Sequence, residues 1–309
     1  MPTFSYGLLM VLLTLHKNIV FIIDLEITEE INMSHNNQKK IAVVNDISGF
    51  GRCSVAVSLP IISAMKIQCC PVPTSIFSNH SGFKEFFFDD YTDRMQQYID
   101  NWKKLDLQFS GIATGFLGSA EQIEIVSRFL KDFKKDNTTV IIDPVMGDYG
   151  KPYATYTKEM CLEMKKLVSY ADILTPNLTE ACILTDTEYS EDIDSKELEN
   201  IVYMLSEKGP DKVVITGLQR GDMVTNLVFE KGKEIDEIST KKIGKERSGT
   251  GDIFASIIAA DAVNGVEFSR SVSKATEFIS KCIEKSIEMD IPYTDGVCFE
   301  EFLTELKSD

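Results

Sequence analysis

Histidine is scarce in this 309-residue sequence, and the scarcity narrows the chemistry that is open to the chain. The chain has three histidines, His16, His35 and His80, of which His80 lies within the body of the predicted fold. A histidine-rich metal site is therefore excluded, because such a site needs several imidazole ligands. A serine–histidine–aspartate triad would have to use His80 as its base.

Cysteines at the spacing of a metal site are also missing. The number of cysteines is odd, and this pattern is typical of reduced cysteines in a cytoplasmic protein. We therefore predict a cytoplasmic location, and we interpret the adjacent pair Cys69–Cys70 as buried strand residues, not nucleophiles. The seven cysteines are Cys53, Cys69, Cys70, Cys161, Cys182, Cys282 and Cys298.

Positive charge is in deficit across the whole sequence. Lysine and arginine total 32 residues against 48 aspartates and glutamates, which gives a formal net charge of -16. This excess of negative charge argues against nucleic acid or an anionic membrane as the main partner. It remains compatible with an anionic nucleotide, which a local cradle and a metal ion can hold. Hydrophobic residues, at 43% of the chain, are sufficient for a large core.

A long uninterrupted hydrophobic run is absent near the start of the chain. Residues 8–15 and 19–23 are largely apolar, but the polar residues 16–18 separate them. The combined stretch is too broken to predict a membrane span. A signal peptide is not supported either, because no small-residue cleavage site follows.

The stretch Met33–Lys40 resembles a native N-terminus that leads into a first strand. We therefore predict that residues 1–39 are an N-terminal extension outside the fold, with membrane anchoring as the alternative interpretation. Internal repeats, low-complexity tracts and linkers are absent from the sequence after Lys40. Residues 40–309 are accordingly predicted to form a single domain.

Short apolar strands alternate with amphipathic helices from Ile41 onward. This alternation predicts an α/β fold in which helices cover both faces of a mostly parallel sheet, giving three layers. Residues 77–88, polar and rich in phenylalanine, are predicted to form a flap. The predicted strands are 41–44, 68–76, 111–114, 139–142, 172–174 and 212–216, with an antiparallel hairpin over 223–230 and 234–240. The predicted helices are 54–65, 90–104, 120–134, 158–169, 195–208 and 268–287, with two more beginning at Asn177 and after Gly249.

Polar residues follow the predicted strands, and ligands of open α/β sheets bind at the carboxyl ends of the strands. Asp143 and Asp148 follow one strand and are candidate ligands of Mg²⁺, which prefers oxygen. A structural alternative remains open for each candidate: Asp143 can bond turn amides, and Asn177 with Glu180 can form a capping box. Likewise, Asp46 can orient a turn, and His80 and Ser81 can be ordinary loop residues. The turns expected at this edge begin at Asp46, Thr114, Asp143, Thr175 and Thr216.

The stretch Gly249-Thr250-Gly251-Asp252 precedes an apolar run over residues 253–260 that predicts a helix. The free N–H groups of a first helical turn, with the helix dipole, attract an anion. Asp252 in that position can act as a base, taking a proton from a hydroxyl that attacks a bound phosphorus. The structural alternative is an aspartate that caps the helix.

These residues also carry a family resemblance. Gly249–Asp252 resembles the anion-hole and catalytic-base signature of the ribokinase superfamily. Phe77–His80, Gly115–Gln122 and Asp143–Gly147 resemble the pyridoxal/pyridoxamine kinase branch, and the similarity extends from about Lys40 to near the C-terminus. The resemblance implies a three-layer ribokinase-like fold with a small β/loop flap. It also implies ATP-dependent phosphorylation of the 5′-hydroxymethyl group of pyridoxal, pyridoxamine or pyridoxine.

The resemblance implies a role for each matching residue. Asp252 would be the general base, and Gly249, Thr250 and Gly251 would stabilise the transferred phosphoryl group. The implied ATP-binding residues are Asp143, Thr175, Asn177, Glu180 and Thr216. The implied Mg²⁺ residues are Asp143, Asp148 and Glu180, and the implied substrate-binding residues are Asp46, His80, Ser81 and Phe116.

Three of the substrate positions depart from the family pattern. Asp46 stands where many members have serine, Ser81 where threonine is common, and Phe116 where many have tyrosine. These departures alter hydrogen bonding to the substrate ring and leave the preferred vitamer open. The resemblance further implies ATP and Mg²⁺ as cofactors, with a monovalent cation as an optional addition, and a homodimer.

Three other functions remain as alternatives. A hydroxymethylpyrimidine kinase of the same superfamily would perform the same chemistry on another heterocycle. A non-catalytic regulator that binds a nucleotide or pyridoxal phosphate is disfavoured by Asp252, since a pure binder needs no base. A dinucleotide-dependent reductase is disfavoured because Ser48–Gly51, after the first strand, does not match the Gly-x-Gly-x-x-Gly fingerprint.

Overall fold

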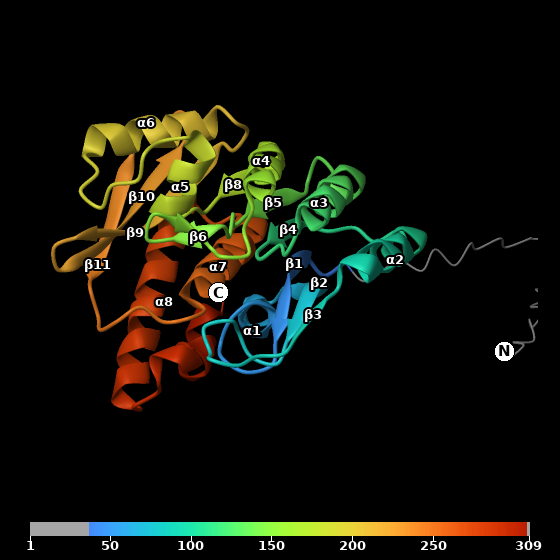
Figure 1. Cartoon of the computed structure of the whole chain (residues 1–309), viewed down its shortest axis with the longest axis horizontal. Helices are drawn as coiled ribbons and strands as arrows, with labels where there is room; N and C mark the ends of the chain where they lie inside the picture. Colours follow the sequence, from blue (N-terminus) through green and yellow to red (C-terminus); the bar gives the residue numbers. More distant parts are fainter. Residues whose placement is uncertain (1–36, 308–309) are drawn as a thin grey trace, which may run out of the picture. The chain divides into compact units, whose positions relative to one another are not determined.

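A nine-stranded sheet forms the centre of the computed structural model, which describes residues 37–307 (Figure 1). The strand order is β11-β10-β9-β8-β5-β4-β1-β2-β3, and the central strands β9, β8, β5, β4, β1 and β2 are parallel. Antiparallel strands complete both edges. The strands are β1 (Lys40–Ser48), β2 (Gln68–Phe77), β3 (Phe88–Asp90), β4 (Gly111–Thr114), β5 (Thr139–Ile142), β8 (Ile173–Leu174), β9 (Lys212–Arg220), β10 (Met223–Glu230) and β11 (Asp236–Lys241).

Helices cover both faces of this sheet, as the sequence predicts. Successive residues of a strand point to opposite faces, so each apolar strand contributes to two cores. Val140 and Ile142 lie in one core and Ile141 in the other. The first core includes α2 (Thr92–Lys104), α3 (Ala120–Phe133), α4 (Lys158–Leu167), α5 (Leu178–Thr185) and α6 (Ser195–Ser206). The second includes α1 (Val55–Ala64), α7 (Thr250–Asn264), α8 (Phe268–Glu288) and the 3₁₀ helix η3 (Glu300–Leu306).

Helix starts follow local capping chemistry that can be recognised in the sequence. Ser119 accepts a hydrogen bond from the Gln122 N–H at the start of α3, and Thr157 accepts one from Met160 at the start of α4. Two shorter 3₁₀ helices, η1 (Val168–Tyr170) and η2 (Tyr293–Asp295), complete the helical elements. Within residues 37–307, no helix is both long enough and apolar enough to cross a membrane.

Some elements differ from the prediction. The sequence predicts a turn after Val44, whereas β1 continues to Ser48 because its pairing with β2 shifts register between Asn45 and Ile47. The predicted hairpin around residues 231–233 is confirmed as β10–β11. Not predicted were β3 and the two-residue strands β6 (Gly147–Asp148) and β7 (Lys151–Pro152), which pair to form a separate small sheet.

The predicted extension, residues 1–39, lies almost wholly outside the described residues. Its last residue, Lys39, contacts the fold by donating to the Val263 carbonyl at 3.0 Å and to Asn264 Oδ1 at 3.2 Å. From Gln38 onward, the chain forms one compact unit.

Candidate active site

The carboxyl ends of the parallel strands bring four predicted site residues together. Asp46 lies at the end of β1, Asp143 follows β5, and Asp252 lies in the first turn of α7. Burial is the main cause of the raised pKa values of Asp143 and of Glu180 on α5; the charge of Asp252 adds to the rise at Asp143, and the charge of Asp143 adds to the rise at Glu180. The acidic side chains therefore form one connected group along the edge of the sheet.

Gly249 begins α7 in a conformation that requires glycine. Its φ is 84°, in the left-handed region, and a Cβ added there would lie 1.9 Å from the Arg52 carbonyl oxygen. At Gly251, by contrast, an added Cβ would meet no atom within 4 Å. The turn therefore packs tightly against Arg52 on one side and opens on the other, where the first N–H groups of α7 can receive an anion.

Asp252 has the electrostatic environment of a base. Burial raises its pKa to about 6, and the charge on Asp46 adds to this effect. The main-chain N–H of Ser54 and the side chain of Asn45 counteract part of the rise in the pKa of Asp252 by hydrogen bonding to the carboxylate. Asp252 is therefore ionised at neutral pH, while it holds a proton more readily than an ordinary aspartate.

Glu180 is held by the capping box of α5, which confirms the structural alternative for this motif. The Asn177 side chain accepts from the Glu180 N–H at 2.9 Å, and Glu180 Oε2 accepts from the Asn177 N–H at 2.8 Å. Glu180 Oε1 also accepts from the Met146 N–H at 3.1 Å. Glu180 is 4% exposed, and both of its carboxylate oxygens accept hydrogen bonds. Glu180 would therefore contact a nearby cation through a water molecule.

The acidic residues Asp143, Glu180 and Asp148 have the donor chemistry that Mg²⁺ requires. Burial raises the pKa values of Asp143 and Glu180 well above the ordinary range, and repulsion from Asp252 at Asp143, and from Asp143 at Glu180, raises them further. A cation would relieve that repulsion. In the part of the chain that is described, no three acidic, histidine or cysteine side chains are grouped closely enough to enclose an ion. These residues therefore fit an ion that shares its coordination with water and phosphate oxygens.

The residues of the predicted nucleotide side also lie next to one another. The Thr175 hydroxyl donates to Asp143 Oδ1 at 3.4 Å, and the Thr216 N–H donates to the Pro176 carbonyl at 2.9 Å. Asn177, which follows β8, forms a parallel β-bridge with Thr216, which lies within β9. Two neighbouring strands thus present Thr175, Asn177 and Thr216 at one place.

Two of the predicted substrate residues, Asp46 and Phe116, lie near strand ends, and the other two, His80 and Ser81, lie on the flap loop. Asp46 is buried and accepts a hydrogen bond from the Ser48 hydroxyl at 3.0 Å, and burial raises the pKa of Asp46. Phe116 is partly exposed and packs edge-on to Phe77 of the flap, with ring centroids 6.1 Å apart. Ser81 is exposed on the flap loop.

His80 has both ring nitrogens bonded to the main chain. The Gly82 N–H donates to Nδ1 at 3.1 Å, which leaves the proton on Nε2, and Nε2 lies 2.7 Å from the Thr294 carbonyl oxygen. His80 therefore joins the flap loop to the segment after α8. In this conformation it supports the loop and has no nitrogen available for a substrate.

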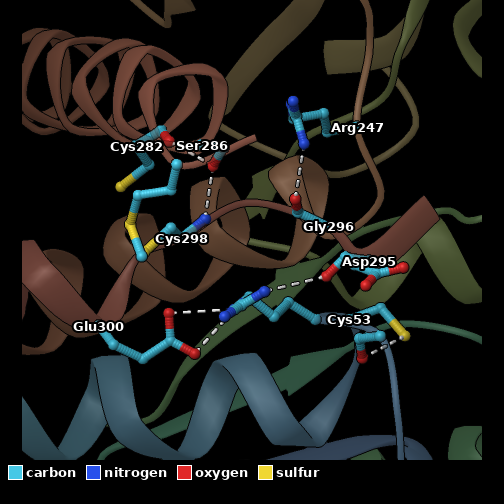
Figure 2. A network of polar contacts seen from close by, with 11 residues as sticks. Cys53, Arg247, Cys282, Ser286, Asp295, Gly296, Cys298 and Glu300 are labelled. Carbon is cyan, nitrogen blue, oxygen red and sulfur yellow. Dashed lines mark hydrogen bonds and ion pairs between the residues drawn. The ribbon is translucent and has the colours of Figure 1, made fainter. Parts of the chain in front are cut away.

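The same segment, residues 291–300, also holds the Gly249 turn in place through hydrogen bonds to Arg52 and Arg247, and Figure 2 shows the bond of Arg247 to Gly296. Both the Arg52 N–H and Arg52 Nη1 donate to the Asp295 carbonyl at 3.2 Å, and Arg52 Nε donates to the two Glu300 oxygens at 2.7 and 3.0 Å. Arg247 Nη1 donates to the Gly296 carbonyl at 3.2 Å. One C-terminal segment therefore supports the turns on both sides of the Gly249 N–H groups.

Sequence reasoning missed Asn45, Arg52 and Arg247. Asn45 Nδ2 donates to Asp252 Oδ1 at 3.1 Å, across 207 positions of sequence. The place of Asn45 beside Asp46 at a strand end was the available signal. Arg52 and Arg247 bind main-chain carbonyls, and these partners cannot be recognised from residue types.

A mostly parallel sheet with an acidic edge and a carboxylate in the first turn of a helix places the chain in the ribokinase-like fold class. The sequence profile of the phosphomethylpyrimidine kinase family matches residues 59–294, and the chain belongs to this family.

Solved structures agree with this assignment. A protein of Bacteroides thetaiotaomicron VPI-5482, provisionally named a phosphomethylpyrimidine kinase, is 38% identical with a TM-score of 0.87, covering 89% of this chain and 96% of that one. A second crystal form of that protein contains pyridoxal. The pyridoxal kinase of Lactobacillus plantarum is 25% identical with a TM-score of 0.81, covering 87% of this chain and 96% of that one.

A curated relative is the pyridoxal kinase of Arabidopsis thaliana, which is 29% identical over 197 residues. The match covers 61% of this chain and 62% of that kinase. The chain thus spans less than two thirds of this relative.

Proposed function

We propose that the chain transfers the γ-phosphoryl group of ATP to the 5′-hydroxymethyl group of a vitamin B6 vitamer. The observation that carries the proposal is Asp252, a carboxylate with a raised pKa beside the open N–H groups of α7. Pyridoxal in a crystal form of the 38% identical Bacteroides protein supports a B6 vitamer as the acceptor.

In the proposed mechanism, Asp252 accepts the proton of the hydroxymethyl group as its oxygen bonds to the γ-phosphorus. The main-chain N–H groups of the Gly249–Gly251 turn take up charge on the phosphoryl oxygens while the bond to the departing ADP breaks. Mg²⁺, when bound, would neutralise phosphate charge. Asp143, Asp148 and Glu180 would hold it, Glu180 through water.

The remaining site residues would bind and enclose the two substrates. Thr175, Asn177 and Thr216 would contact the nucleotide. Asp46 and Phe116 would contact the vitamer ring from the other side. The flap, residues 77–88, would exclude water, which otherwise competes with the alcohol as acceptor. Within the flap, we assign His80 the task of supporting the loop that presents Ser81.

A coupled assay of ADP release tests this proposal directly. Pyridoxal, pyridoxamine, pyridoxine and hydroxymethylpyrimidine would be compared in parallel at equal concentrations. We expect the highest kcat/KM with one of the three vitamers. A higher value with hydroxymethylpyrimidine would instead support the second candidate, a hydroxymethylpyrimidine kinase, which the description of the matching family favours. Absence of turnover with all four compounds would support a non-catalytic binder.

The proposal includes a homodimer, a cytoplasmic location and an optional monovalent cation. Light scattering coupled to size-exclusion chromatography would give the oligomeric state. The same kinetic assay with potassium replaced by tetramethylammonium would show whether a small monovalent cation is needed.

A further inference from the structure

Asn45 lies on β1 near its carboxyl end, its side chain reaches Asp252 in the first turn of α7, and it is 4% exposed. Its side-chain oxygen accepts hydrogen bonds from the N–H groups of Phe116 at 2.8 Å and Asp46 at 3.0 Å. Since an amide nitrogen cannot accept these bonds, the two donors fix which way the amide faces. The side-chain NH₂ group must then face Asp252, whose Oδ1 lies 3.1 Å away.

Packing against Gly115 adds a second restraint on the same amide. A Cβ added at Gly115 would lie 2.5 Å from Cγ and Nδ2 of Asn45 and 2.7 Å from Oδ1. The glycine therefore lets the β4 backbone come into direct contact with the amide plane. Hydrogen bonds and van der Waals contact together hold the Asn45 side chain in one orientation.

We propose that Asn45 is a positioning residue that holds the Asp252 carboxylate in the orientation needed to accept the substrate proton. The inference rests on the proposed role of Asp252 as general base. A carboxylate in the first turn of a helix can rotate about its side-chain bonds, and a donor fixed on a central strand removes that freedom. Orientation matters because proton transfer needs the base within hydrogen-bond reach of the hydroxyl.

The side-chain environment of Asp252 shows why Asn45 is suited to this task. Asp46 on β1 and Asp143 after β5 are acidic neighbours, and the thiol of Cys53 lies close by. None of these three groups is a cation, so an ionised Asp252 depends on neutral donors. The donors are the Asn45 amide and the main-chain N–H groups of Ser54 and of Asp252 itself, and Asn45 provides the side-chain donor.

The substitution Asn45→Asp removes the donor and keeps the shape. Both oxygens of the new carboxylate can still accept from Phe116 and Asp46, but neither can donate to Asp252. We expect kcat to fall roughly 10–100-fold, as when the partners that orient functional groups at metal sites are lost. KM values for ATP and the vitamer should stay close to wild type. The acidic limb of the kcat profile should move to higher pH, because the added charge disfavours ionised Asp252.

The substitution Gly115→Ala tests the same contact without changing the charge of the site. The added methyl group must displace the Asn45 amide, which remains chemically intact. We expect a loss of kcat in the same direction, with ADP binding retained in isothermal titration. If Asn45→Asp fails to fold, the kcat of Gly115→Ala alone tests the positioning role of Asn45.

Asn226→Asp is the matched control for a carboxylate introduced into the buried sheet. Asn226 is 6% exposed, and its amide bonds the Gly217 N–H at 3.1 Å and the Thr276 hydroxyl at 2.8 Å, with no bond to Asp252. The acidic limb of the kcat profile of Asn226→Asp should stay at the wild-type pH, whether or not this variant has a lower melting temperature.

The outcomes separate the inference from the proposed function. Wild-type kcat and pH profile in Gly115→Ala or in folded Asn45→Asp, with an inactive Asp252→Asn, would overturn the positioning role and leave the base in place. Full activity of Asp252→Asn would overturn the role of the base itself.

Discussion

At the residue scale, the site combines a carboxylate that is costly to bury with a glycine that cannot be replaced. Burial raises the pKa of Asp252 because removal of water disfavours its charged form. The N–H groups that flank Gly249 provide the complementary positive field. The pKa of Asp252 and the backbone conformation of Gly249 can each be tested by substitution.

The charge on Asp46 should raise the pH at which Asp252 becomes protonated, in addition to the larger effect of burial. The pKa of Asp252 is raised to about 6, so the ionised base is present above that pH and lost as the pH falls through it. We expect the acidic limb of kcat/KM near that value. Asp46→Asn removes one of the charges that raise the pKa of Asp252, so the limb should move to lower pH. The exposed control Asp93→Asn should leave the limb in place, and an unmoved limb in Asp46→Asn would contradict the coupling.

Gly249→Ala should be far more damaging than a change at an equivalent backbone conformation elsewhere. Gly232 shares a φ of 84°, but an added Cβ meets no atom there within 4 Å. Both substitutions cost about 1 kcal/mol in backbone strain. Only Gly249→Ala also forces a methyl group onto the Arg52 carbonyl. We expect a near-complete loss of kcat in Gly249→Ala and wild-type kcat in Gly232→Ala, with thermal denaturation as the measure of stability.

Several site residues could be predicted from the sequence, because their types and spacing report chemistry. Asp143, Asp252 and Glu180 are acidic residues at a strand end or in the first turn of a helix. Asn45 stands next to Asp46 at the end of the first predicted strand, but its contact with Asp252 could not be predicted, since a buried amide acquires its role from a partner on another element. The contacts of Arg52 with main-chain carbonyls also could not be predicted, because every residue has a carbonyl and only the fold determines which of them lies near Arg52.

At the element scale, the start of α5 combines a helix cap with residues that we propose bind the nucleotide and its metal ion. Asn177 caps the helix and also donates through Nδ2 to the Gly147 carbonyl at 2.9 Å, joining α5 to the β6–β7 hairpin. The capping interpretation is therefore correct and does not compete with the functional one. The first turn of α5 is rigid because of its cap, and a rigid turn is suitable for holding a charged group near phosphates.

Glu180→Gln should separate these two roles. Glutamine offers one acceptor oxygen in place of two, so one of the two hydrogen bonds that Glu180 accepts, from Asn177 or from Met146, is lost at a cost of about 1 kcal/mol. Thr157→Ala, which removes the cap of α4, is the control of similar cost. Both variants should lower the melting temperature. We expect only Glu180→Gln to raise the KM for Mg-ATP, and equal KM values in the two variants would argue against a nucleotide role for Glu180.

The elements that could be predicted are those whose own residues determine them. The apolar strand Thr139–Ile142 and the capped helix α3 each carry their pattern locally. The two-residue strands β6 and β7 depend on pairing with each other across a turn, and β3 is defined by pairing with β2. Such short strands have too few residues for a period-2 pattern to be recognised.

At the scale of the whole molecule, the first strand, β1, begins at Lys40. We expect a chain that starts at Met33 to fold and to keep the turnover of the 309-residue chain, because it retains the contacts that Lys39 and Lys40 make with the rest of the fold. The measurement is kcat/KM together with the melting temperature for both chains. A truncated chain that fails to fold would show that the first 32 residues belong to the core.

The support that residues 291–300 give to the turns around Gly249 has a consequence for biosynthesis. Arg52 is translated 243 residues before Asp295 and 248 residues before Glu300. The sheet can assemble on a nascent chain from its N-terminal strands, but the support of the Gly249 turn is completed only when residues 291–300 dock. A nascent chain that has not yet exposed residues 291–300 therefore lacks the finished support of this turn.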